Sequence, residues 1–276
     1  MADVFATITE ADAATLERLV GAMELRAAQP KQRAMLASYL AELHLPPAAR
    51  ILEVGCGSGA IARFLAARPG VAEVIGVDPS PFFVARAREL ALETPRTADA
   101  VVQADLRFEV ADGRSLGLGE QTFDAVVIHT VLTHVPGPEL MLAEAHRVLR
   151  PGGSLALFEG DNSTASVAIG NCDPLQACVD AAVEALVHDR WIVRRISHLV
   201  QAAGFTVHSF RGHSYIDTEA SYMMTLVDRG ADFLVAWGRI GAELASELKT
   251  EARRRCDRSV FFGHISYASL VAQRPV

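Results

Sequence analysis

The sequence predicts an α/β fold with a mostly parallel sheet. Between residues 51 and 160, short apolar runs such as 51–54 and 74–77 alternate with segments of helical periodicity. Such alternation is typical of βαβ units, in which crossover helices make neighbouring strands parallel. A glycine cluster begins at Gly55, directly after the first run. Because open α/β sheets bind ligands at the carboxyl ends of their strands, this cluster also predicts a binding site.

The first fifty residues are expected to be helical. Leu16, Leu19 and Met23 recur at helical spacing, and a second apolar stripe runs from Met35 to Leu43. Pro30 separates the two stripes.

The central part of the chain supplies the first five strands and their helices. Helices are expected over 61–67, from 79 to about Leu92, and over 139–149, with strands at 51–54, 74–77, 123–129 and 154–158. The third strand has two candidate positions, 100–104 and 106–111. The second is preferred because it ends at the turn signal Asp112-Gly113.

The last third of the chain is less regular. A helix is expected after Asp173-Pro174 and another over 191–203, followed by a strand at 205–210. One long helical stretch then places Leu234, Trp237, Ile240, Leu244 and Leu248 on one face, and a final strand covers 264–272.

Composition limits the class of protein. The 276 residues are 50% hydrophobic, which is enough for a sizeable core, but no apolar run reaches the roughly 20 residues that span a bilayer. Glu10, Asp12 and Glu17 make the N-terminus unlike a signal or transit peptide. We therefore expect a soluble cytoplasmic protein without a membrane partner.

Charge and cysteine usage argue against two further classes. The net charge is −7 and no basic stripe occurs, so a nucleic-acid partner is not expected. Neither a CxxC pair nor a zinc-like Cys/His spacing is found, so no metal site is expected. The cysteines are interpreted as small, mostly buried residues in a reducing compartment: Cys56, Cys172, Cys178 and Cys256.

The chemistry centres on the segment Glu53-Val-Gly55-Cys-Gly57-Ser-Gly59-Ala60. Glycines at a strand-to-helix turn let the backbone approach a ligand closely. Gly55, Gly57 and Ala60 satisfy the dinucleotide fingerprint, with Asp78 about 20 residues further on. An adenosine-containing ligand with Asp78 on its ribose is thus expected, and an NAD(P)-dependent oxidoreductase stays open on this segment alone.

Further motifs resemble class I S-adenosylmethionine-dependent methyltransferases. Five features occur in that family's order: Glu53 with the three glycines, Asp78, Asp112, the pair Phe123-Asp124 and the turn 149–153. The segment Thr133-His134-Val135-Pro136 resembles the small-molecule methyltransferases of ubiquinone and menaquinone biosynthesis.

This resemblance implies a Rossmann-like fold in one domain over residues 1–276. Its seven-stranded sheet would have six parallel strands and the last antiparallel, with added capping helices. It divides the chain into an N-terminal helical cap (1–50), a cofactor-binding core (51–160) and a substrate side (161–276).

The resemblance also implies S-adenosylmethionine as cofactor. Gly55 and Gly57 would line its methionine part, Glu53 would support the loop or the ammonium group, and Asp78 would accept from the ribose. Pro79 would cover the adenine and Asp112 would accept from its amino group. The expected cofactor-binding set is Glu53, Gly55, Gly57, Gly59, Asp78, Pro79, Asp112, Gly113 and His129.

Methyl transfer needs a base only when the nucleophile must lose a proton. His129, His134, Glu159 and Asp161 follow the fourth and fifth strands, and His134 is the preferred catalytic candidate. His129 is expected to offer its backbone carbonyl to the cofactor.

Substrate-lining tyrosines and the role of the last helices remain open. Tyr39, Tyr215 and Tyr222 are candidates for the pocket wall. The helical insert at about 211–260 would act either as a lid or as a dimer interface.

The sequence therefore predicts an enzyme that methylates an O, N or C nucleophile of a small, fairly apolar metabolite. The alternatives are a nicotinamide-dependent oxidoreductase and a catalytically silent, cofactor-binding regulator of the same fold.

Overall fold

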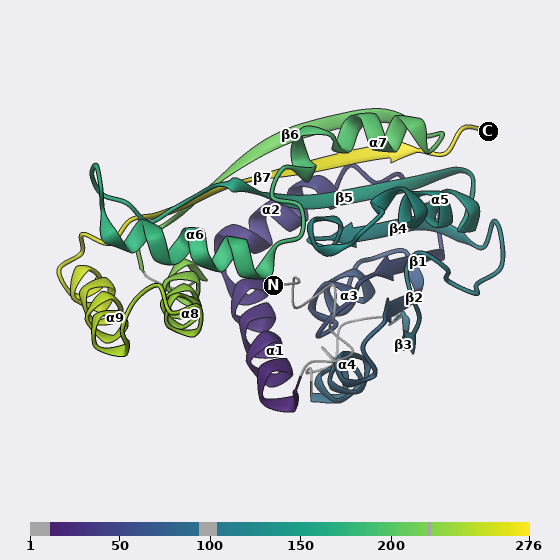
Figure 1. Cartoon of the computed structure of the whole chain (residues 1–276). Helices are drawn as coiled ribbons and strands as arrows, with labels where there is room; N and C mark the ends of the chain where they lie inside the picture. Colours follow the sequence, from purple (N-terminus) through teal and green to yellow (C-terminus); the bar gives the residue numbers. More distant parts are fainter. Residues whose placement is uncertain (1–11, 94–103, 220–221) are drawn as a thin grey trace.

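A seven-stranded sheet forms the centre of the molecule. The computed structural model describes residues 12–93, 104–219 and 222–276. The sheet has the order β3-β2-β1-β4-β5-β7-β6 (Figure 1). Its strands are β1 (Ala49–Val54), β2 (Val71–Asp78), β3 (Asp105–Val110), β4 (Phe123–His129), β5 (Leu149–Ser166), β6 (Thr206–Asp217) and β7 (Gly263–Gln273).

Only β7 runs against its neighbours among these strands. Strands β3, β2, β1, β4 and β5 pair in parallel, and β7 pairs antiparallel with both β5 and β6. The predicted fold class, with its single antiparallel last strand, is confirmed.

Helices cover both faces of the sheet because its strands are apolar on both sides. Ile51 faces the core shared with α2, α3 and α4, whereas Leu52 faces the core shared with α5 and α7. The helices are α1 (Ala13–Ala28), α2 (Pro30–Leu40), α3 (Ala60–Ala66), α4 (Pro81–Glu93), α5 (Pro138–Val148), α6 (Pro174–Leu186), α7 (Ile196–Ala202), α8 (Tyr222–Ala236) and α9 (Ala242–Asp257).

The N-terminal helices form as expected. The Asp12 carboxylate accepts the Thr15 N–H at 2.9 Å and caps α1, while Pro30 occupies the first turn of α2, where no donor is lost. Leu19 of α1 packs with Phe83 of α4, so α1 lies against the sheet-flanking helices.

Several element boundaries differ from the sequence expectation. The third strand is Asp105–Val110, the preferred position; most of the other position, 100–103, lies outside the described residues. Strand β5 is much longer than 154–158. The helix expected over 191–203 is divided into the 3-10 turn Ile192–Arg194 and α7.

The expected long helix near the C-terminus is wrong, because the chain turns between α8 and α9. Gly238 has φ +68°, and the N–H of Arg239 bonds back to the carbonyl of Leu234, which ends α8. Leu234 and Leu248 are therefore buried on separate helices, and Leu244 is 51% exposed.

A three-stranded extension of the sheet supports these last helices. Strands β5 and β7 stay paired to Ser166 and His264, and β6 follows β7 to Gly263, beyond the end of β4. Helices α6, α8 and α9 gather at the far end of this ribbon (Figure 1).

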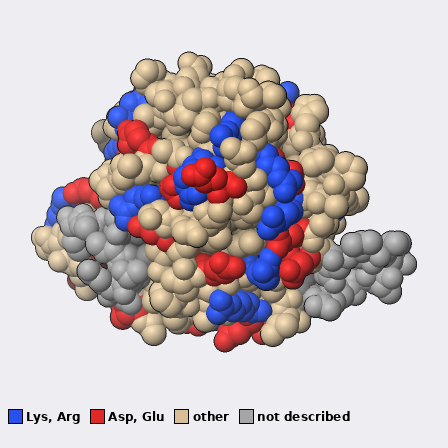
Figure 2. Space-filling model, turned by 90° about the vertical axis from the view of Figure 1, so that its right-hand side faces the viewer, with Lys and Arg blue, Asp and Glu red and all other residues tan. Residues whose placement is uncertain are grey.

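The surface carries mixed charge. On the face in Figure 2, acidic and basic side chains are interspersed over the tan surface. Within the described residues, no helix is both long and apolar enough to cross a bilayer.

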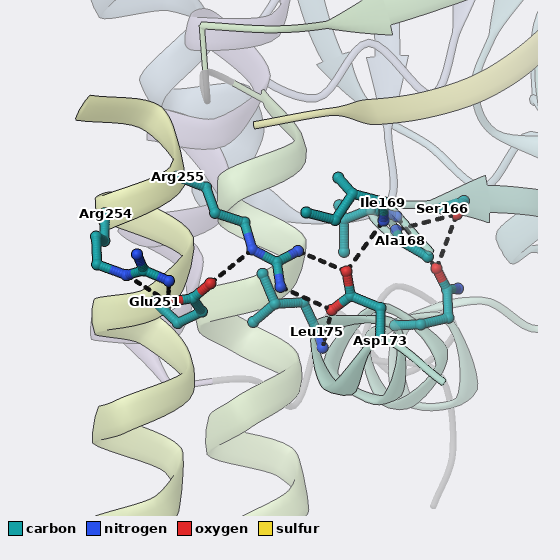
Figure 3. Close-up of polar contacts among 10 residues, drawn as sticks. Ser166, Ala168, Ile169, Asp173, Leu175, Glu251, Arg254 and Arg255 are labelled. Carbon is teal, nitrogen blue, oxygen red and sulfur yellow. Dashed lines mark hydrogen bonds and ion pairs between the residues drawn. The ribbon is translucent and has the colours of Figure 1, made fainter. Parts of the chain in front are cut away.

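A nearly buried ion pair ties α9 to the start of α6 (Figure 3). The Arg255 guanidinium donates to the two Asp173 oxygens at 2.5 and 3.1 Å, and the two side chains are only 9% and 3% exposed. Asp173 also accepts the backbone N–H groups of Ile169 and Leu175, and Arg255 donates to Glu251. The pair thus fixes α9 to the N-terminal end of α6.

We predict that Arg255→Ala lowers the free energy of unfolding by about 3 kcal/mol, because it leaves a buried carboxylate without its cation. Its matched control is the neighbouring Arg254→Ala, since Arg254 is 49% exposed and also pairs with Glu251. Urea unfolding should show a change within about 0.5 kcal/mol for that control. Equal effects of the two substitutions would contradict the assignment.

Candidate functional site

A cavity of about 450 Å³ opens at the carboxyl ends of β1, β2 and β4. That volume lies in the range of small-molecule sites. Of the residues predicted for the site, those that line the cavity are Glu53, Gly55, Gly57, Asp78, Pro79, Asp112, Gly113, His129 and His134.

The glycine turn after β1 is held against β2 by hydrogen bonds. The N–H groups of Gly55 and Cys56 donate to the Val77 carbonyl at 2.8 and 2.9 Å. Gly55 and Gly57 have φ of +75° and +51°. A Cβ atom at Gly55 would overlap Val131, and one at Gly57 would lie 2.7 Å from the Met23 sulfur. Both positions therefore require glycine.

Gly59 has a different place from the other two glycines. It does not line the cavity; it precedes α3 with φ +77°. A Cβ atom there would lie 2.7 Å from the Phe108 ring. The absence of a side chain at Gly59 therefore lets the start of α3 lie close to β3.

Asp78 connects the glycine turn to the end of β2. Its two carboxylate oxygens accept the N–H groups of Gly57 at 3.0 Å and Ser80 at 2.9 Å. Burial raises the pKa of Asp78 to about 6, although these two hydrogen bonds oppose the rise. Each oxygen keeps a further lone pair for a ligand hydroxyl.

Glu53 is fully enclosed beneath the turn. Burial raises its pKa to about 8, with partial opposition from a hydrogen bond to the Ala62 backbone and from Arg63. Its Oε2 atom has no hydrogen-bond partner within the described chain. A buried acceptor without a partner on a cavity wall is suited to a ligand donor or cation.

Asp112 and Gly113 form the wall after β3. Asp112 is engaged by its neighbour: Arg114 donates to it from Nε, Nη2 and the backbone N–H. A Cβ atom at Gly113 would lie 2.5 Å from Val54 and 2.7 Å from Met141. The absence of a side chain therefore keeps this wall close to β1.

His129 ends β4 inside an aromatic stack. Its ring lies 4.7 Å from the Phe158 ring at 10°, and its Nδ1 lies 2.9 Å from the Tyr39 hydroxyl. Burial and the nearby Arg26 hold the pKa of His129 well below its ordinary value. The imidazole is therefore neutral.

The loop after β4 brings His134 to the cavity, and Glu159 fixes that loop. The buried Glu159 Oε1 accepts the N–H groups of Val131 at 2.8 Å and Leu132 at 2.7 Å. Neither Glu159 nor Asp161 lines the cavity. Among the candidate bases, only His129 and His134 lie on its wall.

The three tyrosine candidates also differ in whether they line the cavity. Tyr222 lines the cavity, whereas Tyr39 and Tyr215 are buried in the core. Tyr267, which the sequence analysis did not single out, also lines it. Its position on β7 is brought near the site by the β5–β7 pairing, which local periodicity does not reveal.

The wall opposite the strand ends is helical and was largely missed. Arg26 and Gln32 lie on α1 and α2, and Arg229 lies on α8 of the insert. In the sequence, each of these residues is a polar residue beside apolar neighbours on an amphipathic helix. Solvent-facing residues show the same pattern, so the sequence does not distinguish the two.

These residues fit an adenosine-containing cation. The acids Glu53, Asp78 and Asp112 line the strand side of the cavity, and Glu53 has an unused buried acceptor. No cluster of three or more His, Cys, Asp or Glu side chains that would hold a metal occurs in the described part of the chain.

Parts of this chain are similar in sequence to known proteins. Residues 52–157 match the methyltransferase domain family. An uncharacterized 37.1 kDa protein in transposon Tn4556 of Streptomyces fradiae is 29% identical over 73% of this chain and 56% of its own length. The ubiquinone biosynthesis O-methyltransferase of Xanthomonas oryzae is 37% identical over 44% of this chain and 47% of its own.

A solved structure extends the likeness to most of the fold. A candidate methyltransferase of Bacillus halodurans superposes with a TM-score of 0.62 at 17% identity, over 88% of this chain and 100% of that one. Residues 52–157 thus match a methyltransferase domain, and most of the chain shares the fold of that solved structure. The chain spans about half the length of the two curated relatives named above.

The buried acid Glu53 should make the ligand-free protein less stable as pH rises. Its pKa is about 8 in the folded chain against 4.5 ordinarily, so the folded state binds the proton more tightly. Stability from this group is therefore lost between about pH 4.5 and 8. We predict that Glu53→Gln reduces the fall of the Tm over this range.

Thermal unfolding from pH 5 to 9 measures this effect, with Glu247→Gln as the control, since Glu247 is exposed on α9. The control should follow the wild-type curve. A Glu53→Gln curve parallel to wild type would show that Glu53 is ionised throughout.

Proposed function

We propose that the protein binds S-adenosylmethionine in this cavity and transfers its methyl group to a small-molecule acceptor. One observation carries the proposal: a glycine turn and the acids Glu53, Asp78 and Asp112 line the strand side of one cavity. S-adenosylmethionine has a ribose, an adenine, an ammonium, a carboxylate and a sulfonium group, and its net charge is positive. Cationic groups favour the ionised form of buried carboxyls, so binding offsets their desolvation.

Each residue would have a defined task. Asp78 would accept from the ribose hydroxyls, and Glu53 would receive the ammonium group at its unpartnered oxygen. Pro79 and Gly113 would flank the adenine, with Asp112 accepting from its amino group. Gly55, Gly57 and the His129 backbone would line the methionine part.

The bound cofactor supplies an electrophilic methyl carbon on sulfur. The protein's own part is to align the nucleophile with that carbon and to exclude water. Alignment alone can supply as much as ~7–11 kcal/mol of the barrier. Helices α1 and α8 both contribute to the cavity wall, so we propose that α8 of the insert is part of a lid over the site.

The acceptor is proposed to be a small, largely apolar metabolite with an O, N or C nucleophile. The helical side of the cavity is largely apolar; its apolar residues include Leu36, Val183, Leu186 and Leu226. His134 would take a proton from a nucleophile that must lose one. The similarity to a ubiquinone biosynthesis O-methyltransferase supports this acceptor class.

A cytoplasmic enzyme without a nucleic-acid or membrane partner remains our proposal. The interspersed charges in Figure 2 and the net charge of −7 support it, because a polyanion requires a basic surface. A homodimer through α9, whose Leu244 is exposed, is compatible with the lid role of α8.

We predict that Asp78→Asn weakens binding of S-adenosylhomocysteine by about 10- to 100-fold, because charged hydrogen bonds to the ribose are lost. Asp105→Asn is the matched control, because it removes an acid of the same charge as Asp78. Asp105 is exposed at the start of β3, whereas the cavity lies at the carboxyl ends of the strands. Isothermal titration calorimetry measures both variants. Unchanged affinity in Asp78→Asn would contradict the site.

Turnover is tested by incubating the protein with methyl-tritiated S-adenosylmethionine and a dialysable metabolite extract. Label should enter small molecules with wild type and with Asp105→Asn, but much less with Asp78→Asn. Binding without any transfer would favour the silent regulator, and binding of a nicotinamide nucleotide alone would favour the oxidoreductase.

A further inference from the structure

One face of each of four helices lines the cavity opposite the strand ends. On α1 and α8, the residues that line the cavity recur three or four positions apart, so they lie on one face of each helix. We call this surface the helical wall; its members are Leu19, Ala22, Met23, Arg26 and Ala27 of α1, Gln32, Arg33 and Leu36 of α2, Ala182, Val183 and Leu186 of α6, and Tyr222, Thr225, Leu226 and Arg229 of α8.

The arginines and the acids of the cavity lie mainly on opposite sides. The helical wall carries Arg26, Arg33 and Arg229 and, within the described residues, no Asp or Glu. The acids of the cavity lie on the other side: Glu53 and Asp78 lie at the ends of β1 and β2, and Asp112 follows β3, where Arg114 pairs with it on the cavity wall. In a protein of net charge −7, a cavity wall with three arginines and no acid is suited to anionic ligand groups beyond the single carboxylate of the cofactor.

Arg26 occupies the centre of this arrangement. It is partly buried and donates to the Thr130 hydroxyl at 2.7 Å, next to His129. Its positive charge acts on His129, Glu159 and Tyr267, which lie on three different strands. It forms no ion pair with a carboxylate in the part of the chain that the structure describes, so its guanidinium retains donors for a ligand.

Two buried polar groups, one on α2 and one on β7, lie near Arg26. Gln32 is 5% exposed and Tyr267 is 3% exposed, and both line the cavity. Within the described chain, neither the Gln32 Nε2 nor the Tyr267 hydroxyl has a hydrogen bond of normal geometry. Burial raises the pKa of Tyr267, and the adjacent Gln32 side chain lowers it, so the two groups lie close to one another. Both can donate, and an acceptor on a ligand would offset their burial.

We propose that the methyl acceptor carries an anionic group, a carboxylate or a phosphate, which binds to Arg26 and Arg33 with Gln32 and Tyr267 as further donors. This inference rests on the proposed function, since it names the class of acceptor for the same cavity. The apolar residues of α6 and Leu226 would hold the rest of the molecule. The anion would then fix which end of the acceptor faces the cofactor.

The experiment compares two fluorescent probes that differ in one group. 1-Anilinonaphthalene-8-sulfonate has an apolar body and one anionic group, and N-phenyl-1-naphthylamine has the same body without it. Each is titrated into the protein saturated with S-adenosylhomocysteine. The sulfonate should bind at least tenfold more tightly, and Arg26→Gln should remove about tenfold of its affinity while leaving the neutral probe unchanged.

Arg18→Gln is the matched control, since Arg18 lies two turns earlier on α1, is exposed and does not line the cavity. Arg33→Gln gives a second test, and thermal melts verify that all variants fold. Displacement of the sulfonate by decanoate or by dodecyl phosphate distinguishes the carboxylate from the phosphate.

Equal affinity for the two probes, or equal effects of Arg26→Gln and Arg18→Gln, would overturn the inference. A titration with S-adenosylhomocysteine, made first, distinguishes failure of the proposed function from failure of the anionic-acceptor inference. Without that binding the proposed function fails; with it, but without a preference for the anion, only the anionic acceptor fails.

Discussion

The Asp78 carboxylate holds the site together through the N–H groups that it accepts from Gly57 and Ser80. One hydrogen bond fixes the glycine turn after β1, and the other fixes the first residues after β2. Since β1 and β2 pair in parallel, the two segments emerge at the same edge of the sheet. A buried carboxylate between them satisfies two backbone donors that would otherwise be buried without partners. The glycine turn can therefore stay open toward the cavity.

This arrangement has an electrostatic cost that a ligand offsets. Burial raises the pKa of Asp78 to about 6 and that of Glu53 to about 8, so the ionised forms are disfavoured in the ligand-free protein. A cationic ligand reverses that preference, because it stabilises the carboxylates. The strand side of the cavity is thus suited to a cation, whereas the helical wall, with its three arginines, is suited to an anion.

Much of the sheet and of the cofactor side could be predicted from the sequence, because local features determine them. Buried parallel strands read as short apolar runs, and Asp112-Gly113 placed the end of the third strand correctly. Gly55, Gly57 and Asp78 belong to a motif whose spacing follows one βαβ unit. The ribbon of β5, β7 and β6 was not anticipated in length, since pairing between Ser166 and His264 joins residues far apart in sequence.

The helical wall could not be predicted for the same reason. Arg26 and Gln32 look like solvent-facing residues of amphipathic helices, and only the packing of α1 and α2 against the strand ends encloses them. Gly59 shows the opposite case: it belongs to the binding motif in sequence, but in the fold it does not line the cavity, and a Cβ atom there would overlap Phe108.

The central claim is that the cavity is built for a cationic adenosine cofactor. The most direct test is calorimetric titration of the wild-type protein with S-adenosylmethionine, S-adenosylhomocysteine, NADH and NADPH in parallel. We expect micromolar binding of the first two and none of the nicotinamide nucleotides. Binding of NADH or NADPH without binding of S-adenosylmethionine would contradict the account.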